Sequence, residues 1–101
     1  MKSWGQKDPA ETYAVAFDFS AALQAGETIS SSTWTASTYS GNDSSPSSVL
    51  YGSPLTSGGT VKQTVTGGNS GVSYLVTATV LTSGGSAYIG RAILPVLTQA
   101  P

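Results

Sequence analysis

Apolar and polar residues alternate along several stretches of this chain, which is the period-2 pattern of β-strands. In residues 12–19, with the sequence TYAVAFDF, the large apolar side chains occupy the odd positions and Asp18 lies among the even ones. The residues expected to point inward are Tyr13, Val15, Phe17 and Phe19. We therefore predict a first strand with one buried face and with Asp18 on its outward side.

Further strands are predicted over residues 27–36, 60–66, 72–81 and 86–97. Ile29 and Trp34 have opposite parity in the first of these, so either both faces are covered or a bulge shifts the register. Residues 37–59 are rich in Ser, Gly, Pro and Asn and predict loop, interrupted by a short apolar run at 49–51 that suits an edge strand. Because Pro95 has no N–H, the last strand is expected to be an edge strand or to be bulged near its end.

Six or seven short strands, separated by turn signals and without a helical period, predict an all-β fold: a single antiparallel β-sandwich. A small open barrel would give the same pattern of strands. The length of 101 residues suits one domain. We expect an N-terminal arm and hinge at 1–11, a sandwich at 12–97 and a C-terminal tail at 98–101. Pro9 fixes φ and withholds an N–H where the arm enters the sheet.

The charge of the chain excludes several classes of partner. Only 9 % of the residues are charged and the net charge is −1, so the chain has no basic stripe and is not expected to bind nucleic acid. It lacks both an apolar run long enough to span a bilayer and the apolar core of a signal peptide, so we expect no membrane partner. A low-charge surface of Ser, Thr and Gly suits a protein that its neighbours largely cover.

The residues for catalysis or metal binding are few. The absence of His and Cys removes the usual general base, thiol nucleophile and zinc ligands, so we expect no catalytic residue, no metal and no cofactor. A carboxylate pair of Asp8 and Glu11 is the remaining enzymatic alternative, but these residues flank Pro9 where no cleft is evident. The stretch 41–45 has one carboxylate, Asp43, and therefore reads as a polar turn rather than a calcium loop.

The aromatic residues divide into core and surface candidates. Tyr74 is expected in the core, with its hydroxyl bonded to backbone near a sheet corner, and Trp34 is also expected there. Trp4 precedes the first predicted strand and either anchors in the pocket of a partner or folds back over its own domain. A carbohydrate-binding module, with Tyr39, Tyr51 and Trp34 as a stacking platform, is the alternative function.

Several segments together resemble a known family. They are KDPAET, FDFSAAL, AGETISSSTWT and TVKQTVTGGNSGVSYLVTATVLTSGG, in this order between Lys7 and about Val96. The chain resembles the small bacteriophage fibre–tail adaptor proteins, most specifically in residues 26–30 and in the hairpin at 67–85. The last strand, SAYIGRAILPVLTQAP, departs from the more charged strand of that family and carries only Arg91. This departure leaves open which surface the chain exposes.

The resemblance implies an immunoglobulin-like sandwich and a non-enzymatic structural protein of the virion. It also implies several symmetric copies, assembled in the host cytoplasm, that dock onto other virion proteins of the tail, neck, fibre or capsid. The charges near the start of the domain are expected to mark where it meets its partner. The residues predicted for this interface are Trp4, Lys7, Asp8, Pro9, Glu11, Asp18, Tyr39 and Tyr51.

Overall fold

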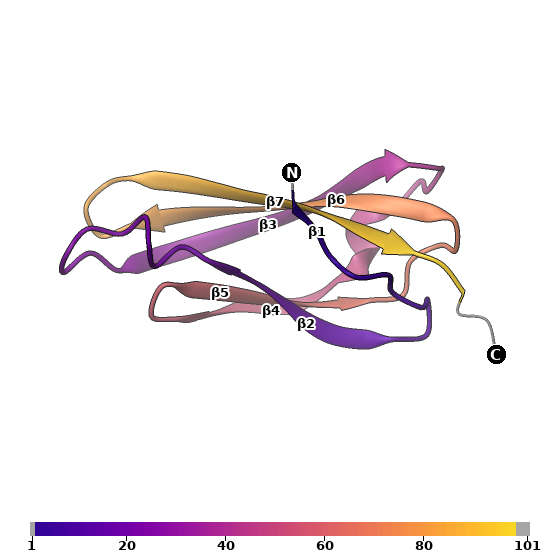
Figure 1. The fold of residues 1–101 in the computed structure, drawn as a ribbon, viewed down its shortest axis with the longest axis horizontal. Coiled ribbons are helices and arrows are strands. Elements are labelled where there is room, and N and C mark those ends of the chain that lie inside the picture. The colour runs from indigo at the N-terminus through magenta and orange to yellow at the C-terminus, as the bar shows by residue number, and fades with distance from the viewer. Residues whose placement is uncertain (1, 99–101) are drawn as a thin grey trace.

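The computed structural model describes residues 2–98, which form two facing β-sheets in an elongated body of 47 × 24 × 24 Å (Figure 1). The strands are β1 (Lys2–Ser3), β2 (Thr12–Asp18), β3 (Ile29–Ser40), β4 (Leu50–Ser57), β5 (Thr60–Thr66), β6 (Val72–Thr82) and β7 (Ala87–Val96). One 3₁₀ turn, η1 (Pro46–Val49), precedes β4. The all-β prediction is thus confirmed. Of the expected C-terminal tail, residues 99–101 lie outside the described residues.

The seven strands divide into a four-stranded and a three-stranded sheet. The first has the order β1-β7-β6-β3 and the second the order β2-β5-β4. All neighbouring strands are antiparallel except β1, which pairs in parallel with β7. Figure 1 shows β1, β7 and β2 along one side of the molecule, where the chain passes from one sheet to the other.

The core fills the space between the two sheets because the strands alternate as their sequences predict. Val15, Phe17 and Phe19 are buried, and Tyr13 is half-buried against the same core. In β5 and β6 every second side chain is buried, as the predicted strands 60–66 and 72–81 require. The other fully buried apolar residues include Val49, Val61, Val65, Tyr74, Val76, Ala78, Val80, Ala92 and Leu94. Burial of this kind contributes about 25 cal/mol per Å² of apolar surface.

Two tryptophans hold the two halves of the core together. Trp4 and Trp34 each pack against both clusters of buried residues. Their rings lie 5.2 Å and 5.3 Å from the ring of Phe17, measured between centroids. Gly90 faces the same ring, and a Cβ at this position would lie 2.8 Å from Cδ1 of Phe17. The close approach of β7 to Phe17 therefore requires glycine at position 90.

The bulge considered for the second predicted strand is present. The register of β3 against β6 shifts between Ile29 and Ser31, and again between Thr38 and Ser40. The first shift brings Ile29 and Trp34 to the same side, where both pack against the core. The opposite parity of these residues in the sequence is therefore resolved by one extra residue in the strand.

The prediction that residues 37–59 are mostly loop was wrong. Strand β3 continues to Ser40, and β4 occupies eight residues from Leu50 to Ser57. β4 is an edge strand, as expected, but its register against β5 breaks between Tyr51 and Leu55, where Gly52 has φ +73° and Pro54 has no N–H. A bulge on an edge strand accommodates both residues, which is why their presence did not end the strand.

The last strand also differs from its prediction. Strand β7 pairs with β6 without a break from Ala87 to Val96, so it has no bulge. Its other edge is not free, because the N–H of Lys7 donates to the carbonyl of Pro95 at 2.9 Å. The N–H and C=O of a strand residue point to the same side of the strand. The nitrogen of Pro95 therefore faces residue 7, and its lack of a hydrogen removes no hydrogen bond from the ladder with β6.

Within residues 2–98 the structure contains no helix that is long and apolar enough to cross a membrane.

Candidate docking surfaces

The N-terminal segment lies against the sandwich. β1 pairs with β7 through Lys2 and Ser3, and the N–H of Trp4 donates to the carbonyl of Ile93 at 2.9 Å. Of the two placements considered for Trp4, the structure has the second, with the indole folded back over its own domain against Phe17. The side chain of Trp4 therefore closes the open side of the core between β7 and β2.

Lys7 is buried, although sequence reasoning placed it at an interface. Its Nζ donates to the carbonyl oxygens of Asp8 and Gly67, both at 2.9 Å. Burial lowers the pKa of Lys7 from its ordinary value, while the nearby carboxylates of Glu11 and Asp8 act in the opposite direction. Because Gly67 is 60 residues away in the chain, this ammonium group fixes the N-terminal segment to the turn between β5 and β6.

Asp8, Pro9 and Glu11 form one tight turn. The Glu11 N–H donates to the Asp8 carbonyl at 2.9 Å, and the Asp8 N–H donates to Oε1 of Glu11 at 2.7 Å. The N–H of Ala10 donates to Oδ1 of Asp8 at 2.8 Å. Asp at the first position and Pro at the second suit a type I turn. The two carboxylates that were the enzymatic candidates thus accept hydrogen bonds from the backbone of their own turn.

The other three carboxylates have similar roles. Oδ1 of Asp18 accepts from the N–H of Ser20 at 2.9 Å. Glu27 accepts from the N–H of Gln24 at 2.9 Å and from the hydroxyl of Thr82, so it ties residues 24–28 to the β6–β7 turn. The pKa of Asp18 is lowered mainly by the amide of Ser20, and that of Glu27 mainly by the amide of Gln24 and then by Thr82.

Asp43 forms part of the predicted corner around Tyr74. The hydroxyl of Tyr74, which is fully buried, accepts from the N–H of Asn69 at 2.8 Å and donates to Oδ2 of Asp43 at 2.6 Å. The expected bond from this hydroxyl to backbone is confirmed. The pKa of Asp43 is lowered by the Tyr74 hydroxyl and then by the amide of Ser45, and burial raises the pKa of Tyr74. The stretch 41–45 is therefore a turn held to the core by its one carboxylate.

The three aromatics of the carbohydrate alternative do not share a face. Trp34 points into the core, against Phe17. Thr38 pairs with the buried Tyr74 and so faces inward, which leaves Tyr39, 56 % exposed, on the outer side of the four-stranded sheet. Tyr51, 65 % exposed, pairs with the outward Thr64 on the other sheet. The stacking platform that this alternative requires is absent.

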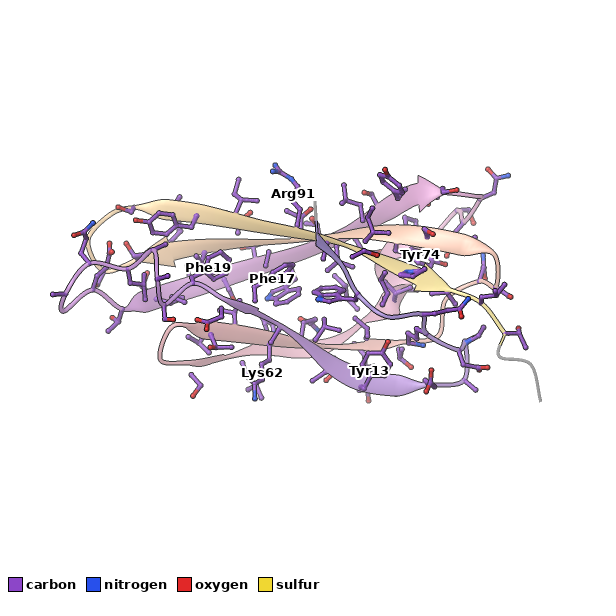
Figure 2. All side chains as sticks on the ribbon, viewed as in Figure 1. Tyr13, Phe17, Phe19, Lys62, Tyr74 and Arg91 are labelled. Atoms are coloured by element: carbon purple, nitrogen blue, oxygen red, sulfur yellow. The ribbon has the colours of Figure 1, made fainter. Side chains whose placement is uncertain are left out.

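The outer side of the four-stranded sheet carries the surface that we name the arginine face. Its large side chains are aliphatic and come from β6 and β7, where Leu81 and Ile89 are each 51 % exposed. Arg91 lies among them and points away from the other sheet (Figure 2). Cross-strand rows join β7, β6 and β3, so that Arg91 pairs with Thr77 and Thr77 with Thr35. The arginine face consists of Leu75, Thr77, Thr79, Leu81, Ile89, Arg91, Ile93 and, on β3, Ser31, Thr33 and Thr35.

The outer side of the three-stranded sheet points in the opposite direction. Lys62 lies there and points away from the core (Figure 2). It pairs with Ala16 on one side and with Leu55, 70 % exposed, on the other. We name this surface the lysine face; it consists of Ala14, Ala16, Tyr51, Leu55, Lys62 and Thr64.

Sequence reasoning placed Tyr39, Tyr51 and Asp18 on the exposed surface but missed the arginine face. The sequence does contain a signal for it, because apolar residues occupy both the odd and the even positions of residues 87–96. Alternate residues of this strand fill the core, namely Ala92, Leu94 and Val96, yet Ile89 and Ile93 lie on the other side. An antiparallel sheet with one solvated face normally alternates apolar with polar residues, so the outward Ile89 and Ile93 depart from that pattern.

The described residues offer surfaces rather than a cavity. Residues 2–98 contain no pocket and no group of three or more acidic, His or Cys side chains that could hold a metal ion. The features available for recognition are the two outer faces, the loops at the ends of the sandwich and the unpaired strand edges.

The comparisons with known proteins place the chain in one family. The family model described as podophage GP4 fiber-tail adaptor protein gp77 matches residues 7–95. No curated protein and no solved structure matches. The match covers both segments that carried the resemblance, residues 26–30 and the hairpin at 67–85. The chain therefore belongs to the podophage fibre–tail adaptor family gp77.

Proposed function

We propose that the chain is a structural protein of a phage virion that joins the tail to its fibres by docking on other virion proteins. The observation that carries this proposal is the family match over residues 7–95, whose description names a fibre–tail adaptor. The adaptor works by binding and holding its partners, without catalysis. Location in the virion, assembly in the host cytoplasm and several symmetric copies belong to the same proposal.

The distribution of side chains supports a connecting role. An adaptor contacts two partners and needs two separate surfaces, and the arginine face and the lysine face point in opposite directions (Figure 2). Each carries exposed aliphatic or aromatic side chains around a single cation. Such surfaces are costly to leave in water over a large area, which supports their burial in an assembly.

An immunoglobulin-like topology is part of the proposal. The strand orders β1-β7-β6-β3 and β2-β5-β4 support it, since the sheets of that fold hold its last, sixth and third strands together. The hydroxyl of Tyr74, near the start of β6, accepts a hydrogen bond from the backbone of Asn69, as in the tyrosine corner of such sandwiches. The residues predicted for the interface from sequence remain candidates where they are exposed: Glu11, Asp18, Tyr39 and Tyr51.

The proposal is tested in the phage that encodes the chain. Particles made without this protein are expected to have tails that lack fibres, and supplying the chain in trans restores the fibres. The measurement is cryo-electron microscopy of purified particles, with mass spectrometry to count the chain and the fibre protein. Particles that lack the chain yet carry a full set of fibres would contradict the proposed function.

A further inference from the structure

We infer that the arginine face binds a different virion protein, not a second copy of this chain, through a surface that combines aliphatic side chains with a carboxylate for Arg91. This inference rests on the proposed function, since it names the chemistry of one partner. It is argued from three observations: the exposed aliphatic side chains of this outer face, the unpaired guanidinium, and the hydrogen bonds that all five Asp and Glu side chains accept.

The first observation is that the outer sides of β6 and β7 carry several aliphatic side chains beside their threonines. Leu75 and Ile93 lie directly opposite each other on this side, and Leu81 and Ile89 are diagonal neighbours. The inner sides of the same strands are filled by the core. Cross-strand aliphatic pairs on an outer face exclude water efficiently only when a second surface covers them.

The second observation is that Arg91 is exposed and unpaired. Within residues 2–98 its guanidinium makes no hydrogen bond or ion pair. Its cross-strand partner is Thr77, and the other outward positions of β3, β6 and β7 carry no acid. A guanidinium that a covering surface removes from water needs an acceptor, and a carboxylate meets its planar fork with two parallel hydrogen bonds.

The third observation argues against this chain as the source of that carboxylate. All five acids of the sequence lie within the described residues, and each accepts a hydrogen bond from its own chain. Asp8 and Glu11 stabilise their own turn. Asp18 accepts from the amide of Ser20, and Glu27 and Asp43 stabilise the loops at the two ends of the sandwich. A bidentate contact of any of them with the Arg91 of a neighbouring copy would use at least one oxygen that already accepts from its own chain.

A two-fold contact between two arginine faces is also unfavourable. Such an interface is self-complementary, so it would bring two copies of a face that holds one cation and no anion against each other. Burying two guanidinium groups without a counter-charge is opposed both by their desolvation and by their mutual repulsion. The partner is therefore a chemically different surface that supplies the anion.

Burial of the arginine face in the particle is measured by thiol labelling. The chain contains no Cys, so a single Thr35→Cys substitution on the exposed side of β3 gives one reporter thiol on this face. We expect a maleimide to label this thiol in the purified protein and about tenfold less in intact virions. Labelling after the same virions are denatured is the control. Equal labelling in intact and denatured virions would overturn the inference.

The carboxylate partner is tested with Arg91→Glu and Arg91→Lys, compared in virions by quantitative mass spectrometry of the chain. Arg91→Glu is expected to lower incorporation at least about tenfold, and Arg91→Lys to retain an intermediate level, since Lys keeps the charge but not the fork. Thermal melting of the purified variants verifies that they fold. Lys62→Glu, the matched charge reversal on the lysine face, is melted alongside them for comparison. Normal incorporation of Arg91→Glu would overturn the inference.

Suppressor mutations then identify the partner class. Phages that regain incorporation of the Arg91→Glu chain are expected to carry an acidic-to-basic change in a different virion protein. A compensating change within this chain would instead indicate a second copy and overturn the inference. If particles without the chain lack fibres while Arg91→Glu is incorporated normally, the docking inference fails and the proposed function stands.

Discussion

At the scale of single residues, the acids of this protein stabilise its loops. Asp18, Glu27 and Asp43 each accept from a backbone amide two or three residues away in the chain, and the last two also accept from a hydroxyl distant in sequence. These hydrogen bonds favour the ionised form, which is why the pKa of each of the three lies below its ordinary value.

The stability of the protein should therefore fall in acid. A carboxyl group whose pKa is lower in the folded state adds stability above its unfolded pKa, roughly 4, and this stability is lost as the pH falls through the folded value. We expect the urea midpoint to be constant between about pH 6 and 7 and lower at about pH 3. Asp43→Asn should reduce the difference between the urea midpoints measured at neutral and at acid pH. An equal midpoint at pH 7 and pH 3 would contradict this role.

The hydroxyl of Tyr74 should contribute more to the stability of the fold than an exposed tyrosine hydroxyl does. Tyr74→Phe removes the acceptor for the Asn69 amide and the donor for Asp43, and we expect a loss of about 1–3 kcal/mol in the free energy of unfolding. Tyr51→Phe, at an exposed position, is the control and should change it by less than about 0.5 kcal/mol. Chemical denaturation measures the free energy of unfolding of both variants. Similar losses for the two would show that the hydrogen bonds of the Tyr74 hydroxyl contribute little to stability.

At the scale of elements, Gln63 explains how an irregular strand fits a regular sheet. At the bulge of β4, the side-chain amide of Gln63 donates to the carbonyls of Tyr51 and Gly52 at 2.7 Å and 3.1 Å. Gln63 is buried among valines, between Val61 and Val65. A polar residue in the middle of an apolar stripe thus supplies a donor to two backbone carbonyls at the bulge.

Replacing Gln63 with Leu should therefore destabilise the protein although it makes the core more apolar. Two carbonyls lose their donor, and we expect a loss of about 1–3 kcal/mol in the free energy of unfolding. Amide hydrogen exchange should also become faster in β4 than in β6. Lys62→Gln, one residue away and exposed, is the control. A variant as stable as the parent chain would show that water or backbone movement satisfies the carbonyls.

At the scale of the whole molecule, the N-terminal segment completes the fold. Residues 2–7 run along β7, Lys7 bonds to Gly67, and Trp4 packs between both core clusters. The segment thus covers the edge of β7 that would otherwise offer a template for pairing. It also places the turn at residues 8–11 beside the start of β2, where the chain changes sheet.

Trp4 should accordingly act as a core residue. Trp4→Ala is expected to lower the free energy of unfolding by about 2–4 kcal/mol, since it removes a large half-buried ring against Phe17. The midpoint of thermal unfolding of the purified variant measures this loss. Gln6→Ala, at an exposed position of the same segment, serves as the control. An unchanged melting temperature for Trp4→Ala would instead favour a role of this indole at a partner surface.

The sequence by itself determined the strands whose side chains alternate, because a period of two directly reflects which face is buried. Residues 12–19, 60–66 and 72–81 therefore became β2, β5 and β6 with the expected inward residues, and Tyr74 was recognised as a corner residue. Only the tertiary structure decided where β4 runs, because the backbone at Tyr51 and Gly52 is held by Gln63, 12 and 11 residues away. It also decided that Lys7 and Trp4 turn inward and that Ile89 and Arg91 face outward. Charge and apolarity are properties of a residue, whereas burial depends on which distant strand lies opposite it.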